Sequence, residues 1–208
     1  MNIRRQKGFA YAIGAILFVL SMTGCAGQQP VRNGTIESPP TASEQPISDL
    51  PATKTLPVEL EGMTELAPAK LVESELGYAL YIMDHFEFTP EEPGRDIIFH
   101  QQFPDYFARI EPLPGDADME HLRTHAEQML EAVGSPVTAL QGDEITDPAI
   151  RANAEFVLHA EHAEGSVDLL VMKIGDRVYR FMLNIPDGEA AEGITPRFYA
   201  MIDSIVDQ

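Results

Sequence analysis

In the C-terminal third of the chain, runs of apolar residues are separated by short segments of turn-forming residues. Three short runs are rich in β-branched, aromatic and aliphatic side chains, which is typical of strands. Glycine in the two intervening turns, at Gly165 and Gly175, supplies the positive φ that tight hairpins need. We therefore expect an antiparallel meander made of residues 156–162, 167–174 and 178–185.

The third of these runs divides into two faces, because side chains alternate across a strand. The face that we expect to be buried contains Tyr179, Phe181, Leu183 and Ile185. The second run is apolar throughout residues 169–172, which favours a central strand that is covered on both sides. We therefore expect helices on both faces of the sheet.

Two segments have the three- and four-residue spacing of amphipathic helices. The first can be capped by Asp116 or Asp118 and can end at Gly134. The second begins at Thr195, an N-cap residue, with Pro196 at the first helical position. The apolar face of the first contains Met119, Leu122, Ala126, Met129, Leu130 and Val133, and that of the second contains Phe198, Met201, Ile202 and Ile205.

Three more strands are expected at residues 78–83, 96–100 and 106–111. The element order predicts an α+β fold, with one antiparallel sheet of about six strands and helices on both faces. With its Gly-Tyr start at 77–78, its Phe-Ala-Arg-Ile run at 107–110 and its final helix at 198–205, the chain resembles the PsbP-like α/β/α sandwich over residues 73–208. That resemblance implies a binding protein more readily than an enzyme.

The N-terminus resembles a bacterial lipoprotein precursor. Residues 1–7 carry three positive charges, and residues 8–20 are apolar, a run that is too short to span a bilayer because a helix needs about 20 residues. Met22-Thr23-Gly24-Cys25 follows and resembles a lipobox. The resemblance implies a signal peptide at 1–24, cleavage between Gly24 and Cys25, and lipid on the Cys25 thiol. The alternative is an ordinary signal or an uncleaved anchor with a chance cysteine.

Two or more acyl chains on Cys25 would anchor the chain stably, whereas one would not. Ala26 follows the cysteine in place of a retention aspartate, so the expected location is the cell membrane or the outer membrane, outside the cytoplasm. Residues 25–72 are rich in proline, serine, threonine and glutamate, and we interpret them as a disordered tether. Residues 73–208 form the predicted globular domain.

Charge narrows the range of partners. The chain has 14 Lys and Arg against 33 Asp and Glu, a net charge of −19, and removing residues 1–24, which hold three basic residues and no acid, leaves 11 against 33, or −22. Such a surface repels nucleic acid and attracts cations or basic partners. It is also typical of a soluble protein whose copies repel one another. The single cysteine excludes an internal disulfide.

No group of residues in the sequence predicts a catalytic, cofactor or metal site. His121 and His125 have a chelating spacing on the first helix but lack the glutamate of metalloproteases, and we expect both to be exposed. His159 and His162 should point to opposite faces of their strand. Paired acids such as Glu91-Glu92 are interpreted as solvated loop residues.

The leading hypothesis is therefore a lipid-anchored, non-enzymatic module that binds or supports an envelope protein or a small cationic ligand. One alternative is an enzyme whose site brings His100, His125, His162 and nearby acids together from distant parts of the chain. Another is a lipoprotein that binds cations through its overall acidity.

Overall fold

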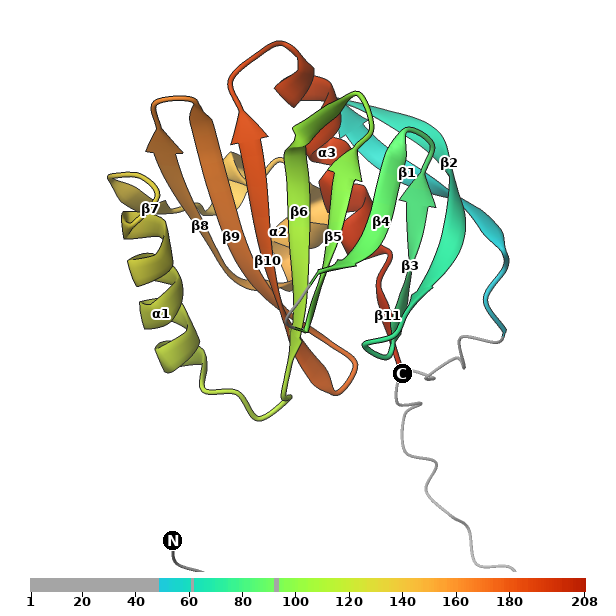
Figure 1. The fold of residues 1–208 in the computed structure, drawn as a ribbon, viewed down its shortest axis with the longest axis horizontal. Helices are drawn as coiled ribbons and strands as arrows, with labels where there is room; N and C mark the ends of the chain where they lie inside the picture. The colour runs from blue at the N-terminus through green and yellow to red at the C-terminus, as the bar shows by residue number, and fades with distance from the viewer. Residues whose placement is uncertain (1–48, 61, 92–93) are drawn as a thin grey trace, which may run out of the picture. The chain divides into compact units, whose positions relative to one another are not determined.

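The computed structural model describes residues 49–60, 62–91 and 94–208, all within a compact unit formed by residues 42–208. In this part of the chain two antiparallel sheets are packed with three α-helices (Figure 1). The smaller sheet has the order β1 (Thr53–Leu60), β2 (Met63–Ser74), β3 (Tyr78–Met83), β11 (Val206–Asp207). The larger has the order β4 (Phe86–Glu91), β5 (Arg95–His100), β6 (Phe103–Leu113), β10 (Arg177–Pro186), β9 (Gly165–Ile174), β8 (Ala154–His162), β7 (Val137–Ala139).

The fold-class prediction is wrong. The described residues form two sheets of four and seven strands, rather than one sheet of about six strands in an α/β/α sandwich of the PsbP-like type. All six strands expected from the sequence are present, but β1, β2, β4, β7 and β11 were missed. Three of the missed strands contain proline, at Pro57, Pro68 and Pro90. Two of these, β1 and β4, are edge strands, where a missing N–H is tolerated.

Residues 53–72 were assigned to the tether, whereas the structure pairs residues 53–60 of β1 with residues 63–70 of β2. Their apolar residues do alternate: Leu56 and Val58 are buried, and the proline between them is exposed. Ala67 and Ala69 continue the pattern on β2, with Pro68 exposed between them. This period of two is typical of a half-buried hairpin, but it was not recognised because the buried alanines are small and prolines lie between the buried residues.

Helix α3 (Ala190–Asp203) packs between the two sheets, against β1 and β3 on one side and β6 and β10 on the other (Figure 1). Five consecutive residues, Phe198–Ile202, are buried, so this helix has no solvent-facing stripe along that stretch. The predicted start at Thr195 is wrong, because the helix begins at Ala190 and continues through Pro196. The expected apolar residues of its second half, Phe198 among them, are buried as predicted.

Helix α1 (Met119–Glu131) covers the other face of the larger sheet, over β7, β8 and β9. Asp118 caps it as predicted, and its carboxylate accepts hydrogen bonds from the N–H groups of Glu120 and His121 at 2.9 and 3.1 Å. Ala126 and Leu130 are buried against the sheet, whereas Val133 is 47% exposed. Leu169, Leu170 and Val171 are fully buried between the two helix-covered faces, which confirms that β9 is covered on both sides.

The end of the chain joins the two sheets. Val206 and Asp207 pair with Ala79 and Tyr78 of β3. The Asp207 carboxylate accepts a hydrogen bond from the Tyr179 hydroxyl of β10 at 2.6 Å and forms an ion pair with Arg177. The smaller sheet is therefore bonded to the larger one through side chains of its last strand. None of the described helices is long and apolar enough to cross a membrane.

Candidate functional site

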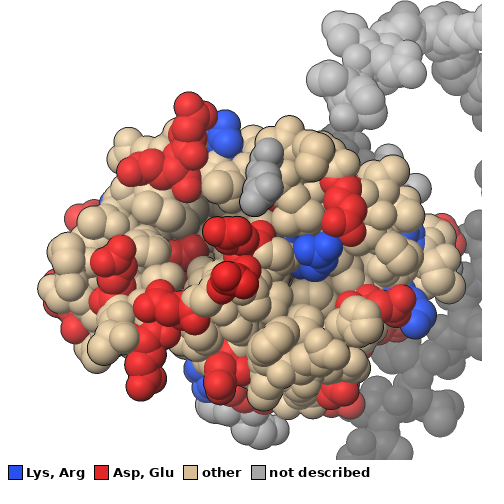
Figure 2. Space-filling view, turned by 90° about the horizontal axis from the view of Figure 1, so that it is seen from above, with Lys and Arg blue, Asp and Glu red and all other residues tan. Residues whose placement is uncertain are grey.

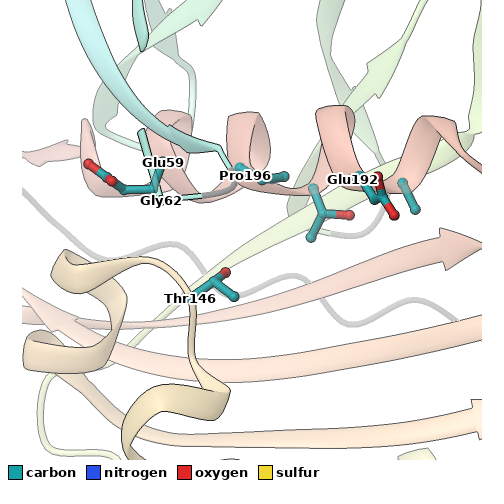
Figure 3. A pocket seen from close by; sticks show the side chains of 7 residues that line it. Glu59, Gly62, Thr146, Glu192 and Pro196 are labelled. Carbon is teal, nitrogen blue, oxygen red and sulfur yellow. The ribbon is translucent and has the colours of Figure 1, made fainter. Parts of the chain in front are cut away.

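A pocket of about 570 Å³ lies beside α3, between that helix, the turn that joins β1 to β2, and the segment that leads into α2 (Pro148–Asn153). Thr146 faces the helix across it, and Glu59 and Glu192 lie at its two ends (Figure 3). Gly62 has a φ of 80° in the β1–β2 turn, a conformation that favours glycine. The lining of this α3 pocket consists of Glu59, Gly62, Thr146, Ala191, Glu192, Thr195 and Pro196.

The proline inside α3 changes the hydrogen bonding of the pocket wall. Pro196 has no N–H to donate to the carbonyl of Glu192, four residues earlier. In the next position, the Arg197 guanidinium donates to the Gly193 carbonyl at 2.5 Å. The hydroxyl oxygen of Thr195 is buried and has no hydrogen-bond partner among the residues that the structure describes. Buried polar atoms usually have partners, so this wall is suited to a ligand that brings one.

The charges around the α3 pocket are negative. Its charged lining residues are two glutamates, and no lysine or arginine of the described chain lines it. An adjoining pocket of about 230 Å³ shares Glu59 and adds Asp147 and Asp203, with Lys54 as its one basic residue. Burial raises the pKa of the Asp203 carboxyl, and the nearby Asp147 carboxylate raises it further. On the face seen in Figure 2, acidic side chains likewise outnumber basic ones around a hollow.

A buried polar chain also connects α3 to the larger sheet. Asp168 on β9 is 5% exposed, and its carboxylate accepts a hydrogen bond from the Tyr199 hydroxyl at 2.6 Å. Its other oxygen lies 2.6 Å from Nδ1 of His159, the opposite residue on β8. The hydrogen bond to Asp168 raises the pKa of His159, despite burial. Burial, together with the charge of Asp168, raises the pKa of Tyr199.

This chain of hydrogen bonds fixes α3 on the sheet. Every polar atom named in it has a partner, and no serine, threonine or cysteine nucleophile takes part. The hydroxyl of Tyr199 points inward to Asp168. The prediction that His159 and His162 face opposite sides is confirmed. His159 faces α3, whereas His162 lies close to Gly134, beyond the end of α1.

The histidines of the enzyme hypothesis have no common partner among the described residues. His100 packs against Phe86 and Phe103, and His125 lies 3.1 Å from a guanidinium nitrogen of Arg180. Nδ1 of His162 accepts a weak hydrogen bond from a backbone N–H at 3.3 Å. His121 and His125 are exposed as expected. No group of three His, Cys, Asp or Glu side chains in the described part of the chain is arranged to hold a metal ion.

Sequence reasoning did not find the α3 pocket. Glu59 and Gly62 were assigned to the tether, and Glu192 lies before the predicted helix start at Thr195 but is in the first turn of α3. An alternating pattern over residues 56–60 was the one available signal for the hairpin. Gly24 and Cys25, the predicted cleavage and lipidation residues, lie outside the described residues.

Comparisons with known proteins identify a family. A crystal structure from Bacteroides thetaiotaomicron is similar at 11% sequence identity and a TM-score of 0.34, over 63% of this chain and 45% of that one. This chain therefore spans less than half the length of that structure. No curated protein matches the chain. A family model described as "Domain of unknown function (DUF8580)" matches residues 50–206, and the chain belongs to this family.

Proposed function

We propose that the chain is a non-enzymatic lipoprotein, held outside the cytoplasm by lipid on Cys25, which binds a small amphiphilic cation in the α3 pocket. The observation that carries this proposal is the combination of a 570 Å³ pocket with carboxylates at both ends and no basic side chain in its lining. A volume in this range is typical of small-molecule sites. The site chemistry supports binding rather than turnover.

The pocket suggests how such a ligand would be held. Ala191 and Pro196 offer apolar surface for the body of the ligand. An ammonium group would be attracted by Glu59 or Glu192 and could donate to the unpartnered hydroxyl of Thr195. The net charge of −19 would raise the local concentration of cations near the protein.

Ligand binding can be tested by thermal unfolding of the full chain in a non-ionic detergent. Hexylammonium should raise the melting temperature in proportion to its binding, and hexanol, which has the same body without the charge, should raise it less. Glu192→Gln and Thr195→Val should each reduce the hexylammonium shift. Glu189→Gln removes an exposed acid three residues away that does not line the pocket, and it should leave the shift unchanged.

Two outcomes would contradict the ligand proposal. The first is an equal shift in all three variants, which would indicate attraction to overall charge. The second is a shift with millimolar calcium that equals the shift with hexylammonium, which would favour general cation binding. Anchoring is tested separately by growth with labelled palmitate. The label should appear in the wild-type chain and not in Cys25→Ser, and an unlabelled wild-type chain would remove the lipoprotein part of the proposal.

A further inference from the structure

The seven arginines of the described residues all form ion pairs with carboxylates, but these pairs differ in exposure. Five of the arginine side chains are 14–32% exposed. Arg123 and Arg151 are 44% and 38% exposed, and their partners Glu127 and Asp143 are 43% and 101% exposed. Because water screens such pairs, they contribute little to stability. These two guanidinium groups can therefore exchange their partners for a ligand more easily than the other five.

Arg123 and Arg151 come from different helices, α1 and α2, and line the same pocket of about 290 Å³. The α3 pocket has no basic residue in its lining, and its neighbour at Asp203 has one lysine. In a chain with 33 acidic residues and 14 basic ones, this cavity has two arginines and one acidic residue, Glu155, in its lining. We call this cavity the arginine pocket.

Apart from the two arginines, the lining of the arginine pocket mixes apolar residues with Gln141 and Glu155. Leu140, Ile145, Phe156 and Val157 contribute to its walls. The Arg123 guanidinium lies over the Phe156 ring, 5.6 Å from its centroid. Arg151 is held in place, because its Nε donates to the Ile145 carbonyl at 3.0 Å and its Nη1 donates to Asp143 at 3.1 Å. The two cationic groups thus border a cavity with an aromatic side.

We propose that the arginine pocket binds a small monoanionic carboxylate with an aromatic body. A guanidinium group is planar and presents paired N–H donors that match the two oxygens of a carboxylate. Phe156 and its aliphatic neighbours would cover the ring of the ligand. Glu155 also lines the pocket, and its charge opposes a dianion such as phosphate more strongly than a monoanion. This site is independent of the cation proposed for the α3 pocket.

The test is a fluorine NMR titration of 4-fluorobenzoate with the full chain in a non-ionic detergent. We expect saturable line broadening, and a dissociation constant at least tenfold higher in the Arg123→Gln, Arg151→Gln double variant. Arg197→Gln is the control for the single variant Arg123→Gln, because each removes one positive charge and Arg197 pairs with Glu65 outside this pocket. It should change the constant less than twofold. A tenfold loss in this control would overturn the site, since bulk charge would then explain the binding.

Two further measurements test whether binding depends on the charge of the ligand or only on an apolar cavity. 4-Fluorobenzamide has the shape of the probe without its charge and should bind at least tenfold more weakly, and equal binding would overturn the role of the arginines. Glu155→Gln should tighten 4-fluorobenzoate binding, and inorganic phosphate should compete less well than unlabelled benzoate. Stronger competition by phosphate would overturn the assignment to a monoanionic aromatic carboxylate.

Folding of the variants is checked by thermal unfolding. Arg151→Gln loses the bond to the Ile145 carbonyl, so a weaker constant there could come from a loosened wall. Arg123→Gln loses only an exposed pair and its contact with Phe156. The proposal therefore requires that Arg123→Gln alone weakens binding of 4-fluorobenzoate while its melting temperature stays unchanged. Unchanged affinity in Arg123→Gln would overturn the proposed two-arginine site.

Discussion

The two long helices of the described residues, α1 and α3, are stabilised in different ways. Helix α1 covers one face of the larger sheet, buries only Ala126 and Leu130, and has a side-chain cap at Asp118. Helix α3 lies between two sheets, buries Phe198–Ile202 without a gap, and has no side-chain cap hydrogen bond at Glu189. This difference indicates that the stability of α1 depends on local sequence signals, whereas the stability of α3 depends on tertiary packing. Substitutions at corresponding features of the two helices should therefore have unequal effects.

The largest effect is expected from Phe198→Asp in α3. This side chain is fully buried between the sheets, and an aspartate there would be a charge without a partner in the core. We expect a loss of more than about 4 kcal/mol of unfolding free energy, enough to prevent stable folding. The control is Val133→Asp, two residues beyond the end of α1. This side chain is 47% exposed, and the change should alter the free energy by less than about 0.5 kcal/mol. Urea unfolding followed by circular dichroism measures both.

A smaller effect is expected when α3 loses its hydrogen bond to the sheet. Tyr199→Phe leaves one oxygen of the buried Asp168 carboxylate without its donor, which should cost about 1–3 kcal/mol. Tyr106→Phe is the control, because that hydroxyl donates to the half-buried Pro186 carbonyl at 2.8 Å. We expect a loss of about 1 kcal/mol or less there. Equal losses of unfolding free energy in the two variants, measured by urea unfolding, would show that the hydrogen bond to Asp168 stabilises the fold no more than the one to Pro186 does.

The caps provide the next comparison. Asp118→Ala removes the carboxylate that accepts two N–H groups at the start of α1 and should cost about 1 kcal/mol. Glu189→Ala at the start of α3 removes no side-chain cap bond and should have almost no effect on unfolding. The idea that α1 depends on local signals fails if the two substitutions cost the same.

The smallest effect is a dependence of stability on pH at His159. The hydrogen bond to Asp168 raises the pKa of this histidine in the folded protein, so the folded state binds the proton more tightly than the unfolded state does. The resulting stabilisation is complete below the unfolded pKa, about 6.5, and is lost as pH rises through the higher folded pKa. Unfolding free energies measured from pH 6 to 9 should therefore fall more steeply in the wild type than in His159→Gln.

The sequence predicted best where local patterns were strong. The helix α1 was identified with its cap and with its buried residues Ala126 and Leu130, and the strand β9 was identified with its burial on both sides. It failed at Pro57 and Pro68, because proline argues against a strand unless the sheet is already known. It also failed at Pro196, because proline is common at the first position of a helix and rare inside one. The α3 pocket was missed for the same reasons, since it is built from the hairpin and from the first turns of α3.

The strand β11 has a consequence for how the protein can be handled. The backbone N–H of Tyr81 donates to Ser204, 123 residues later in the chain, and β3 gains its second neighbour from residues 206–207. A chain that emerges during synthesis cannot complete the smaller sheet until these residues have appeared. An insertion next to residues 206–207 would crowd this seam, and an internal loop position would be a better site for a label.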